Sequence, residues 1–280
     1  MKKWLFVISI LMLALSCVGQ KDDPEEEPVV DPEPVGPVTG PEGPQEEGNH
    51  FRRSLILDFT GTWCVNCPKM EAAILDAQTR RPDRLVCVSV HCLAADKMAV
   101  LPLSKDLAAR FGVTAYPSAV MDMDAESLVT TSSADLLLAQ CDRLLAERPL
   151  AAGIKVSSTL ADGTATVRIE AKAVRDGSYS LHCVLLEDGI VASQIGGSTE
   201  HVHNNVLRVW VDSEAFEREA GDTVEWSCEA EAAEGWRVVA FVCRGGIVDN
   251  VCSCKLGDKT DFNYEIVYEK EELQNTGTQG

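Results

Sequence analysis

Two cysteines separated by two residues, Cys64 and Cys67, are the side chains of this 280-residue sequence best placed to do chemistry. They follow the apolar run 55–57 and open a segment with helical character, so they lie where a strand turns into a helix. A pair at this spacing can close a disulfide, and the first sulfur then faces the positive end of the helix dipole, which favours the reactive thiolate. We therefore predict thiol–disulfide redox chemistry at this pair.

The same spacing also supplies half of a zinc site, which needs a second pair of ligands. The candidate second pair, Cys252 and Cys254, lies in the other half of the chain and has only one residue between its members. The sequence also lacks a phosphate-binding loop, a nucleophile elbow and an internal repeat. We therefore expect no metal and no cofactor.

The elements that position the cysteine pair belong to a predicted α/β domain over residues 51–149. Residues 55–59 and 85–90 are almost entirely apolar, as expected for strands buried on both faces of a parallel sheet. Pro68 falls in the first turn of the helix between them, where its missing N–H costs nothing. A second helix, further short strands and a last helix that stops before Pro149 complete the order β-α-β-α-β-β-α.

This first half resembles the core of the thioredoxin fold. Trp63 directly precedes the Cys-x-x-Cys motif, Asp58 lies six residues before Cys64, and Pro117 lies about fifty residues beyond the motif. The resemblance implies that Cys64 is an exposed attacking thiolate and that Cys67 resolves the mixed disulfide. It also implies that Asp58 is buried behind Cys67 with a raised pKa and takes the proton of the resolving thiol. The alternative for Asp58 is a strand-end acid at the surface.

The same resemblance implies a substrate-binding edge. Pro117 matches the family's cis-proline, has no backbone donor, and would present the edge of Tyr116 to a bound peptide beside Trp63. His91 ends the second strand on the same side of the sheet. It either tunes Cys64 or is a satisfied strand-end histidine.

One departure from that family lies between the two cysteines. Val65 and Asn66 are neither the Gly-Pro of thioredoxins nor the Pro-His of strong oxidases, and neither supplies a positive charge to hold a thiolate. A strongly oxidising potential is therefore not expected. A reductase, an isomerase and a redox site that has lost its activity all stay open.

The second half, residues 150–270, is predicted as an all-β domain of the immunoglobulin-like sandwich class. Seven or eight short strand patterns with Asp-Gly and Gly-Gly turns follow at short spacing, and the first two form a hairpin around Asp162-Gly163. His201 and His203 lie on one face of a strand or loop. They form either a metal or ligand site or an ordinary polar loop.

The remaining cysteines fit an exported protein, in which disulfides are permitted. Cys141 lies on an apolar helical face, which indicates a buried small hydrophobe rather than a reactive thiol. Cys183 and Cys243 fall in mid-strand and either pair or stay as buried free thiols. The sequence does not decide the pairing of a larger set, which comprises Cys87, Cys92, Cys183, Cys228, Cys243, Cys252 and Cys254.

The first fifty residues predict export and anchoring. Residues 1–16 have a charged start, an apolar core too short to span a membrane, and a run of small residues, as a signal peptide has. Cys17 directly after them resembles a bacterial lipoprotein box, which implies lipidation there; the alternative is a plain secretory signal. Residues 17–50 hold seven of the twelve prolines and ten acidic residues, which predicts a disordered tether. A polar tail is predicted at 271–280.

The charge balance excludes some partners. The net charge is −19, of which −7 lies in the signal and tether, leaving −12 on residues 51–280. Such a balance argues against binding to nucleic acid or to anionic membrane surfaces. Since no segment is apolar over a length that could span a bilayer, we predict membrane attachment by a lipid anchor only.

The pairing of the two halves resembles the Omp-twenty-eight-related outer membrane proteins. The resemblance rests on the lipoprotein signal, the Thr-Gly-x-Trp-Cys-x-x-Cys-Pro motif and the run 200–208, and it covers most of residues 51–268. It implies an outer membrane lipoprotein on the periplasmic or the cell-surface face. The segment 20–23 resembles a sorting signal to the outer face, or simply solvates the tether.

Two functions stay open. One is a cell-envelope thiol–disulfide oxidoreductase that acts on the thiols and disulfides of exported proteins. The residues that favour it are Asp58, Trp63, Cys64, Cys67 and Pro117. The other is a surface-exposed binding or adhesion lipoprotein in which the Cys-x-x-Cys pair is only a structural bridge. The acidic tether and the β-rich second half favour it.

Overall fold

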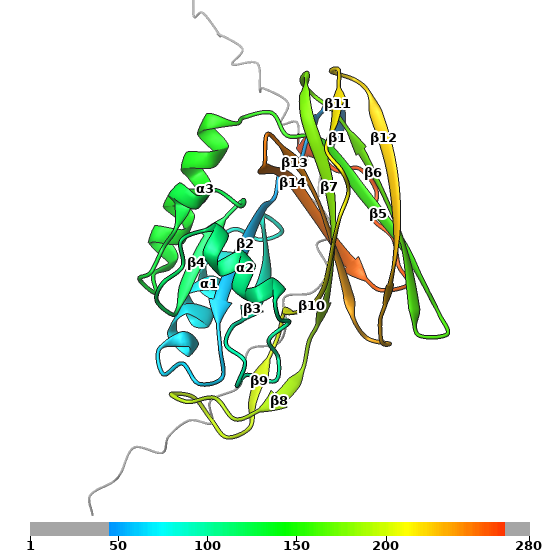
Figure 1. The fold of residues 1–280 in the computed structure, drawn as a ribbon. Coiled ribbons are helices and arrows are strands. Elements are labelled where there is room, and N and C mark those ends of the chain that lie inside the picture. The colour runs from blue at the N-terminus through cyan, green and yellow to red at the C-terminus, as the bar shows by residue number, and fades with distance from the viewer. Residues whose placement is uncertain (1–44, 267–280) are drawn as a thin grey trace, which may run out of the picture. The chain divides into compact units, whose positions relative to one another are not determined.

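The computed structural model describes residues 45–266 (Figure 1). Within this range the helices are α1 (Cys67–Arg80), α2 (Leu103–Arg110), α3 (Ala134–Glu147) and the short 3-10 helix η1 (Ala125–Ser127). The strands of the first half are β1 (Gln45–His50), β2 (Ser54–Thr60), β3 (Leu85–His91) and β4 (Ser118–Met121). The strands of the second half are β5 (Gly153–Ala161), β6 (Thr164–Lys172), β7 (Gly177–Glu187), β8 (Ile190–Ala192), β9 (His201–His203), β10 (Val206–Asp212), β11 (Phe216–Arg218), β12 (Thr223–Glu231), β13 (Arg237–Arg244), β14 (Ile247–Lys255) and β15 (Tyr264–Ile266).

Several predicted segments lie outside the described residues: the signal peptide, Cys17, most of the tether and the polar tail. Within residues 45–266, none of the helices has the length and apolar character needed to cross a bilayer.

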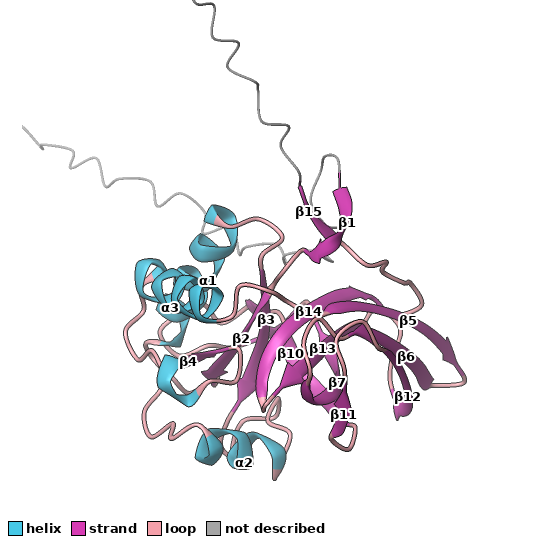
Figure 2. Ribbon diagram, turned by 90° about the horizontal axis from the view of Figure 1, so that it is seen from above, coloured by secondary structure: helices cyan, strands magenta, loops and turns pink. Residues whose placement is uncertain are grey.

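One mixed sheet runs through both halves of the chain. Its strands follow the order β14-β13-β7-β10-β3-β2-β4, and β11 adds to β7. Strands β2 and β3 are parallel, and β10 joins β3 in parallel where Val206 lies opposite Ser89. Figure 2 shows this sheet with the helices gathered at its β2–β4 end and with β5, β6 and β12 at the other end.

The predicted fold class, an α/β thioredoxin-like domain followed by an all-β immunoglobulin-like sandwich, is therefore wrong. The described chain is dominated by strands and has only three α-helices, and the strands of the first half continue into those of the second half. A free edge of β3 would leave backbone groups unpaired, and the second half covers that edge: the N–H of Ser89 donates to the carbonyl of Asn205. Local periodicity does not report which distant strand covers an edge.

Strands β2 and β3 are buried along their whole length, as predicted for strands covered on both faces. On one face, Ile56 and Cys87 pack with residues of α1 and α3. On the other face, Leu57 and Val88 share a cluster with residues of α2 and with Phe241 of β13. The two halves of the chain therefore share a core.

A third cluster lies between the large sheet and a separate three-stranded sheet of order β12-β6-β5. Strands β5 and β6 form the predicted hairpin around Asp162 and Gly163, both of which have positive φ. Asp and Gly tolerate that conformation. Along β12 every second residue is half-buried and the residues between are exposed, so one face of this strand packs on the core.

Two small strand pairs complete the described part. Residues 45–50, which were predicted as the disordered end of the tether, instead form β1 and pair with β15, with His50 opposite Tyr264. Strands β8 and β9 form a hairpin in which Ile190 lies opposite His203. The connection between β8 and β9 reaches the cysteine pair.

Candidate functional site

A disulfide joins Cys64 and Cys67 at the start of α1, with its sulfurs 2.07 Å apart and its Cα atoms 5.4 Å apart. Cys67 is the first residue of α1 and Pro68 follows it, where a helix leaves its backbone N–H groups without intrahelical partners. Cys64 lies in the turn before the helix, and its N–H donates to the carbonyl of Gly61 at 3.0 Å. The predicted position of the pair, between a strand and a helix, is confirmed.

The exposure of the two sulfur-bearing residues differs from the prediction. Cys64 is 4% exposed and Cys67 is 3% exposed, so both are buried. The expectation that Cys64 is the exposed member is wrong. The difference arises from a segment of the second half that packs on the turn before α1.

That segment is Gln194–Gly197 in the connection between β8 and β9. The side-chain amide of Gln194 donates to the carbonyls of Cys64 at 2.8 Å and of Gly61 at 3.3 Å, and the N–H of Ile195 donates to the carbonyl of Thr62 at 2.8 Å. A Cβ on Gly196, which has a φ of +81°, would come within 2.1 Å of the carbonyl oxygen of Val65. Only glycine fits this approach. Sequence reasoning missed the segment, although the adjacent glycines beside Gln194 are a signal of close backbone contact.

Asp58 of β2 is buried, as predicted, and its Oδ1 atom has no hydrogen-bond partner among the described residues. Burial raises the pKa of Asp58, and the nearby Glu71 carboxylate raises it further, to about 8. A carboxyl group in this state is protonated at neutral pH and can exchange its proton near that pH.

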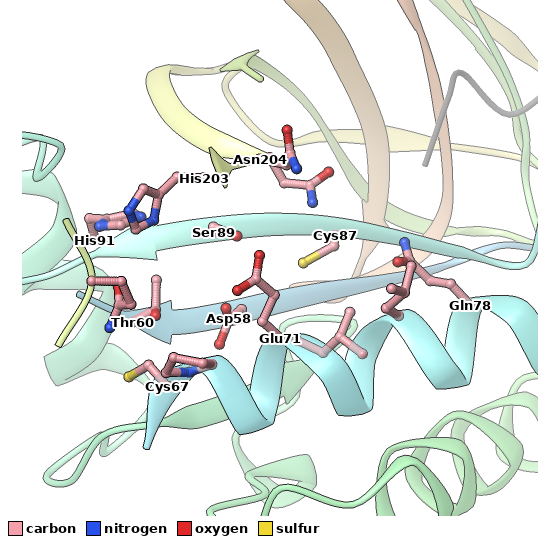
Figure 3. Close-up of a pocket in the computed structure, with 15 residues that line it drawn as sticks. Asp58, Thr60, Cys67, Glu71, Gln78, Cys87, Ser89, His91, His203 and Asn204 are labelled. Carbon is pink, nitrogen blue, oxygen red and sulfur yellow. The ribbon is translucent and has the colours of Figure 1, made fainter. Parts of the chain in front are cut away.

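Asp58 and Cys67 line the same cavity, of about 50 Å³, behind the disulfide (Figure 3). A cavity needs only about 10–15 Å³ to hold one water molecule, so this one has room for water. Figure 3 shows Asp58 between Cys67 and Glu71, with Ser89 of β3 and His203 of β9 on the opposite side. Asp58 and Cys67 therefore border one partly polar cavity.

A group of histidines borders this cavity. His91 Nδ1 lies 3.0 Å from Asp96 Oδ2, which also accepts from the N–H of Thr62. Burial alone would raise the pKa of Asp96, but hydrogen bonding and charge interaction with His91, together with backbone donors, lower it to about 2. His91 is thus the satisfied strand-end histidine, one of its two predicted readings.

The two histidines of β9, His201 and His203, differ in their surroundings. His201 Nε2 lies 2.9 Å from Glu71 Oε2. Burial, with the neighbouring His91 and His201, lowers the pKa of His203 to about 4, and its Nε2 atom has no partner among the described residues. Within residues 45–266, no group of three or more His, Cys, Asp or Glu side chains is arranged to hold a metal ion.

Two of the predicted substrate-binding residues, Trp63 and Tyr116, contact each other. The rings of Trp63 and Tyr116 meet edge to face with centroids 5.2 Å apart, and Trp63 Nε1 donates to the carbonyl of Cys92 at 3.0 Å. The Tyr116–Pro117 bond is cis, as expected. Since Ser118 pairs with Phe59, Pro117 lies at the end of β2 from which the cysteine motif follows.

Of the other cysteines, Cys141 is buried on α3, as predicted for a small hydrophobe. Cys183 and Cys243 do not pair, because they pack in different clusters on opposite faces of the large sheet. Cys87 of β3 borders the cavity behind the disulfide.

Comparisons with known proteins give a likeness of fold. No family model and no curated protein matches the chain. Among solved structures, HBP35 of Porphyromonas gingivalis is similar with a TM-score of 0.64 and 16% identity, over 80% of this chain and 82% of that one. The protein AGR_C_4864 of Agrobacterium tumefaciens is similar with a TM-score of 0.54 and 14% identity, over 78% of this chain and 100% of that one.

Each of these matches spans most of the chain, so the shared feature is the β-rich arrangement of both halves together. At such low identity the likeness concerns the fold alone. Neither structure is described as an Omp-twenty-eight-related protein, so that resemblance stays a prediction from the sequence.

Proposed function

We propose that the Cys64–Cys67 pair is a reversible thiol–disulfide exchange site that acts on the thiols and disulfides of exported proteins. The observation that carries the proposal is the shared cavity: the buried carboxyl group of Asp58, with a pKa of about 8 and an oxygen without a partner, borders the same space as Cys67. A disulfide with only a structural role needs no proton donor behind it.

The reaction balances with a dithiol partner. A thiolate of the partner attacks the sulfur of Cys64, the Cys64–Cys67 bond breaks, and its electron pair passes to the sulfur of Cys67, which takes a proton from Asp58 through the cavity. The mixed disulfide now joins the partner's first sulfur to Cys64. The partner's second thiolate attacks that first sulfur, so Cys64 leaves as a thiolate and the partner becomes a disulfide. In the reverse direction Asp58 takes the proton of Cys67 as this residue resolves the mixed disulfide.

Access to Cys64 is the restriction on this reaction. Because Cys64 is buried and Gln194 hydrogen-bonds its carbonyl, a protein partner reaches the sulfur only after the segment Gln194–Gly197 has moved aside. Local opening of a loop held by a few hydrogen bonds is a low-energy event compared with global unfolding.

A redox titration of the full chain in glutathione buffers tests the proposal. A reduction potential of the Cys64–Cys67 pair between about −120 and −270 mV, the range of known oxidoreductases, is the expected result. A potential below about −300 mV, typical of structural disulfides, would contradict it.

The second candidate function is a surface-exposed binding or adhesion lipoprotein whose disulfide is a structural bridge. The observation that favours it is the burial of both cysteines beneath the second half of the chain. The same titration separates the two functions, because a bridge that only supports a binding surface resists reduction at every physiological glutathione ratio.

We also propose that the chain is an outer membrane lipoprotein anchored through Cys17, with no nucleic-acid partner. The support is the signal-like run before Cys17 and the acidic charge. Mass spectrometry of the membrane fraction should find an acylated N-terminal Cys17; a mature protein that begins elsewhere would contradict it.

A further inference from the structure

Cys183 and Cys228 belong to the same hydrophobic cluster between the two larger sheets. Cys183 lies in the middle of β7 of the large sheet, is fully buried, and belongs to the cluster between the sheets. Cys228 lies on β12 of the three-stranded sheet, on the face of alternating half-buried residues that packs on the same cluster.

The arrangement of the strands brings these residues to the same place. Cys183 pairs with Val211 of β10, and β12 is the strand of the three-stranded sheet that lies against β10. The two thiols interact, since each shifts the pKa of the other. Both are free cysteines in this structure.

The other thiols of this core are placed differently. Cys183 pairs with Ala240 of β13, which in turn pairs with Cys252 of β14. Two strand spacings, about 9.5 Å, therefore separate Cys183 from Cys252, more than the roughly 7 Å that a disulfide can span between Cα atoms. Cys254, two residues along the same strand, is near enough to Cys183 to raise its pKa, so it is the other thiol that the experiment must distinguish.

We propose that Cys183 and Cys228 are a second dithiol site, which is oxidised reversibly to a disulfide that links β7 of the large sheet to β12 of the three-stranded sheet. The proposal does not depend on the activity of Cys64 and Cys67. The proposed disulfide lies in the second half of the chain, whereas Cys64 and Cys67 lie in the first half.

The order of the steps follows from the surroundings of the two thiols. Cys228 is half-buried, and the hydrogen bond from Cys183 lowers its pKa, so it supplies the thiolate that a soluble oxidant meets first. The pKa of Cys183 is raised, mainly by its hydrogen bond with Cys228 and also by burial. Cys183 therefore stays protonated longer and acts as the second, inner thiol.

The oxidant is a small-molecule disulfide such as oxidised glutathione. The Cys228 thiolate attacks one of its sulfurs, a protein–glutathione disulfide forms, and the first glutathione leaves as a thiolate that takes a proton. Cys183, on losing its proton, attacks the sulfur of Cys228 and releases the second glutathione. Two protein thiols are oxidised and one glutathione disulfide is reduced to two thiols.

Peptide mapping of the full chain tests the proposal directly. The protein is equilibrated in glutathione buffers from reducing to oxidising, quenched with acid, alkylated after unfolding, and digested without reductant. We expect a peptide linked through Cys183 and Cys228 that appears as the buffer becomes oxidising and disappears on reduction. The state of Cys64 and Cys67 is read in the same digest, so failure of either proposal is seen separately.

Two variants sharpen the result. Cys228→Ser should leave Cys183 available to alkylation in every buffer, whereas the matched variant Cys254→Ser should keep the linked peptide. Oxidation should also raise the urea midpoint of the wild-type protein and of Cys254→Ser, but not that of Cys228→Ser, because the link restricts the unfolded chain.

A Cys183 that stays free in the wild-type protein at every glutathione ratio would overturn the proposal, as would a Cys183 linked to a different cysteine. The wild-type map alone decides the question if Cys228→Ser does not fold.

Discussion

At the scale of single residues, the site depends on a carboxyl group that the fold keeps away from water. Asp58 is enclosed by β2, β3 and α1, and one of its oxygens lacks a partner within residues 45–266. A buried acid of this kind destabilises the fold at any pH where it is ionised in the unfolded chain. Function is a reason for a chain to retain such a group.

The stability cost of Asp58 should depend on pH. Its pKa rises from 3.8 to about 8 on folding, so between these values the folded state holds a proton that the unfolded state has released. The free energy of unfolding therefore falls as pH rises from about 4 to about 8, and the fall stops above. The free energy of unfolding of Asp58→Asn, measured relative to wild type by urea unfolding, should therefore increase by up to about 4 kcal/mol as the pH rises from 5 to 8.

The control for that experiment is Asp162→Asn in an exposed turn, where asparagine accepts the positive φ equally well. Its difference from wild type should stay constant over the same pH range. A pH-independent difference for Asp58→Asn as well would mean that Asp58 is not protonated in the folded protein.

The two cysteines should differ in reactivity once they are reduced. Cys64 precedes the N-terminus of α1, whose dipole stabilises its thiolate, whereas Cys67 lies in the first turn and borders the cavity that Asp58 lines. At pH 7 the free thiol of Cys67→Ser should be alkylated about tenfold faster than that of Cys64→Ser. Mass spectrometry of the peptide that contains the pair gives both rates. Equal rates would remove the assignment of Cys64 as the attacking residue.

At the scale of elements, the sequence predicted the pieces nearest the cysteines and missed what covers them. Local patterns predicted the strands β2 and β3, the start of α1 and the hairpin of β5 and β6, whereas the burial of Asp58 was implied only by the family resemblance. The segment Gln194–Gly197 does not, because its contact with the turn before α1 joins residues about 130 positions apart, as the separation of Gln194 and Cys64 shows. Loop composition indicates a turn but not the surface on which the loop rests.

The covering segment should control how fast the disulfide is reduced. Gly196→Ala places a Cβ within 2.1 Å of the carbonyl of Val65, so the segment must shift away from Cys64. The loss of one hydrogen bond weakens the closed position of the segment by about 0.5–1.5 kcal/mol. Because the segment must open before the disulfide can react, we expect reduction by dithiothreitol to be up to about tenfold faster. The measurement is the rate at which both cysteines become available to alkylation.

Gly189→Ala is the matched control, because Gly189 has a similar φ of +74° in the same part of the chain but no atom within 4 Å of the added Cβ. It introduces the same backbone strain without the clash. If both variants are reduced at the wild-type rate, the segment does not limit access to Cys64.

At the scale of the whole molecule, polar contacts tie together the halves that the sequence suggested were separate. Asn250 of β14 donates to the carbonyls of Phe51 at 3.1 Å and of Ala152 at 2.8 Å, and accepts from the N–H of Arg53 at 3.0 Å. Its amide thus satisfies backbone groups at the start of each half. Such a bridge, like the pairing of β10 with β3, connects residues too far apart in the chain for hydrophobic periodicity to reveal.

Because the halves share one sheet and one core, we expect them to unfold together. Two buried cysteines report on the halves separately: Cys141 on α3 and Cys254 on β14. Their alkylation in increasing urea, with the Cys64–Cys67 disulfide intact, should give the same midpoint. Asn250→Ala leaves buried backbone groups without partners, so it should lower both midpoints equally, by about 2–4 kcal/mol in the free energy of unfolding. If Cys141 and Cys254 react at different midpoints in the wild-type protein, the halves are independent domains and the continuous sheet does not make them one cooperative unit.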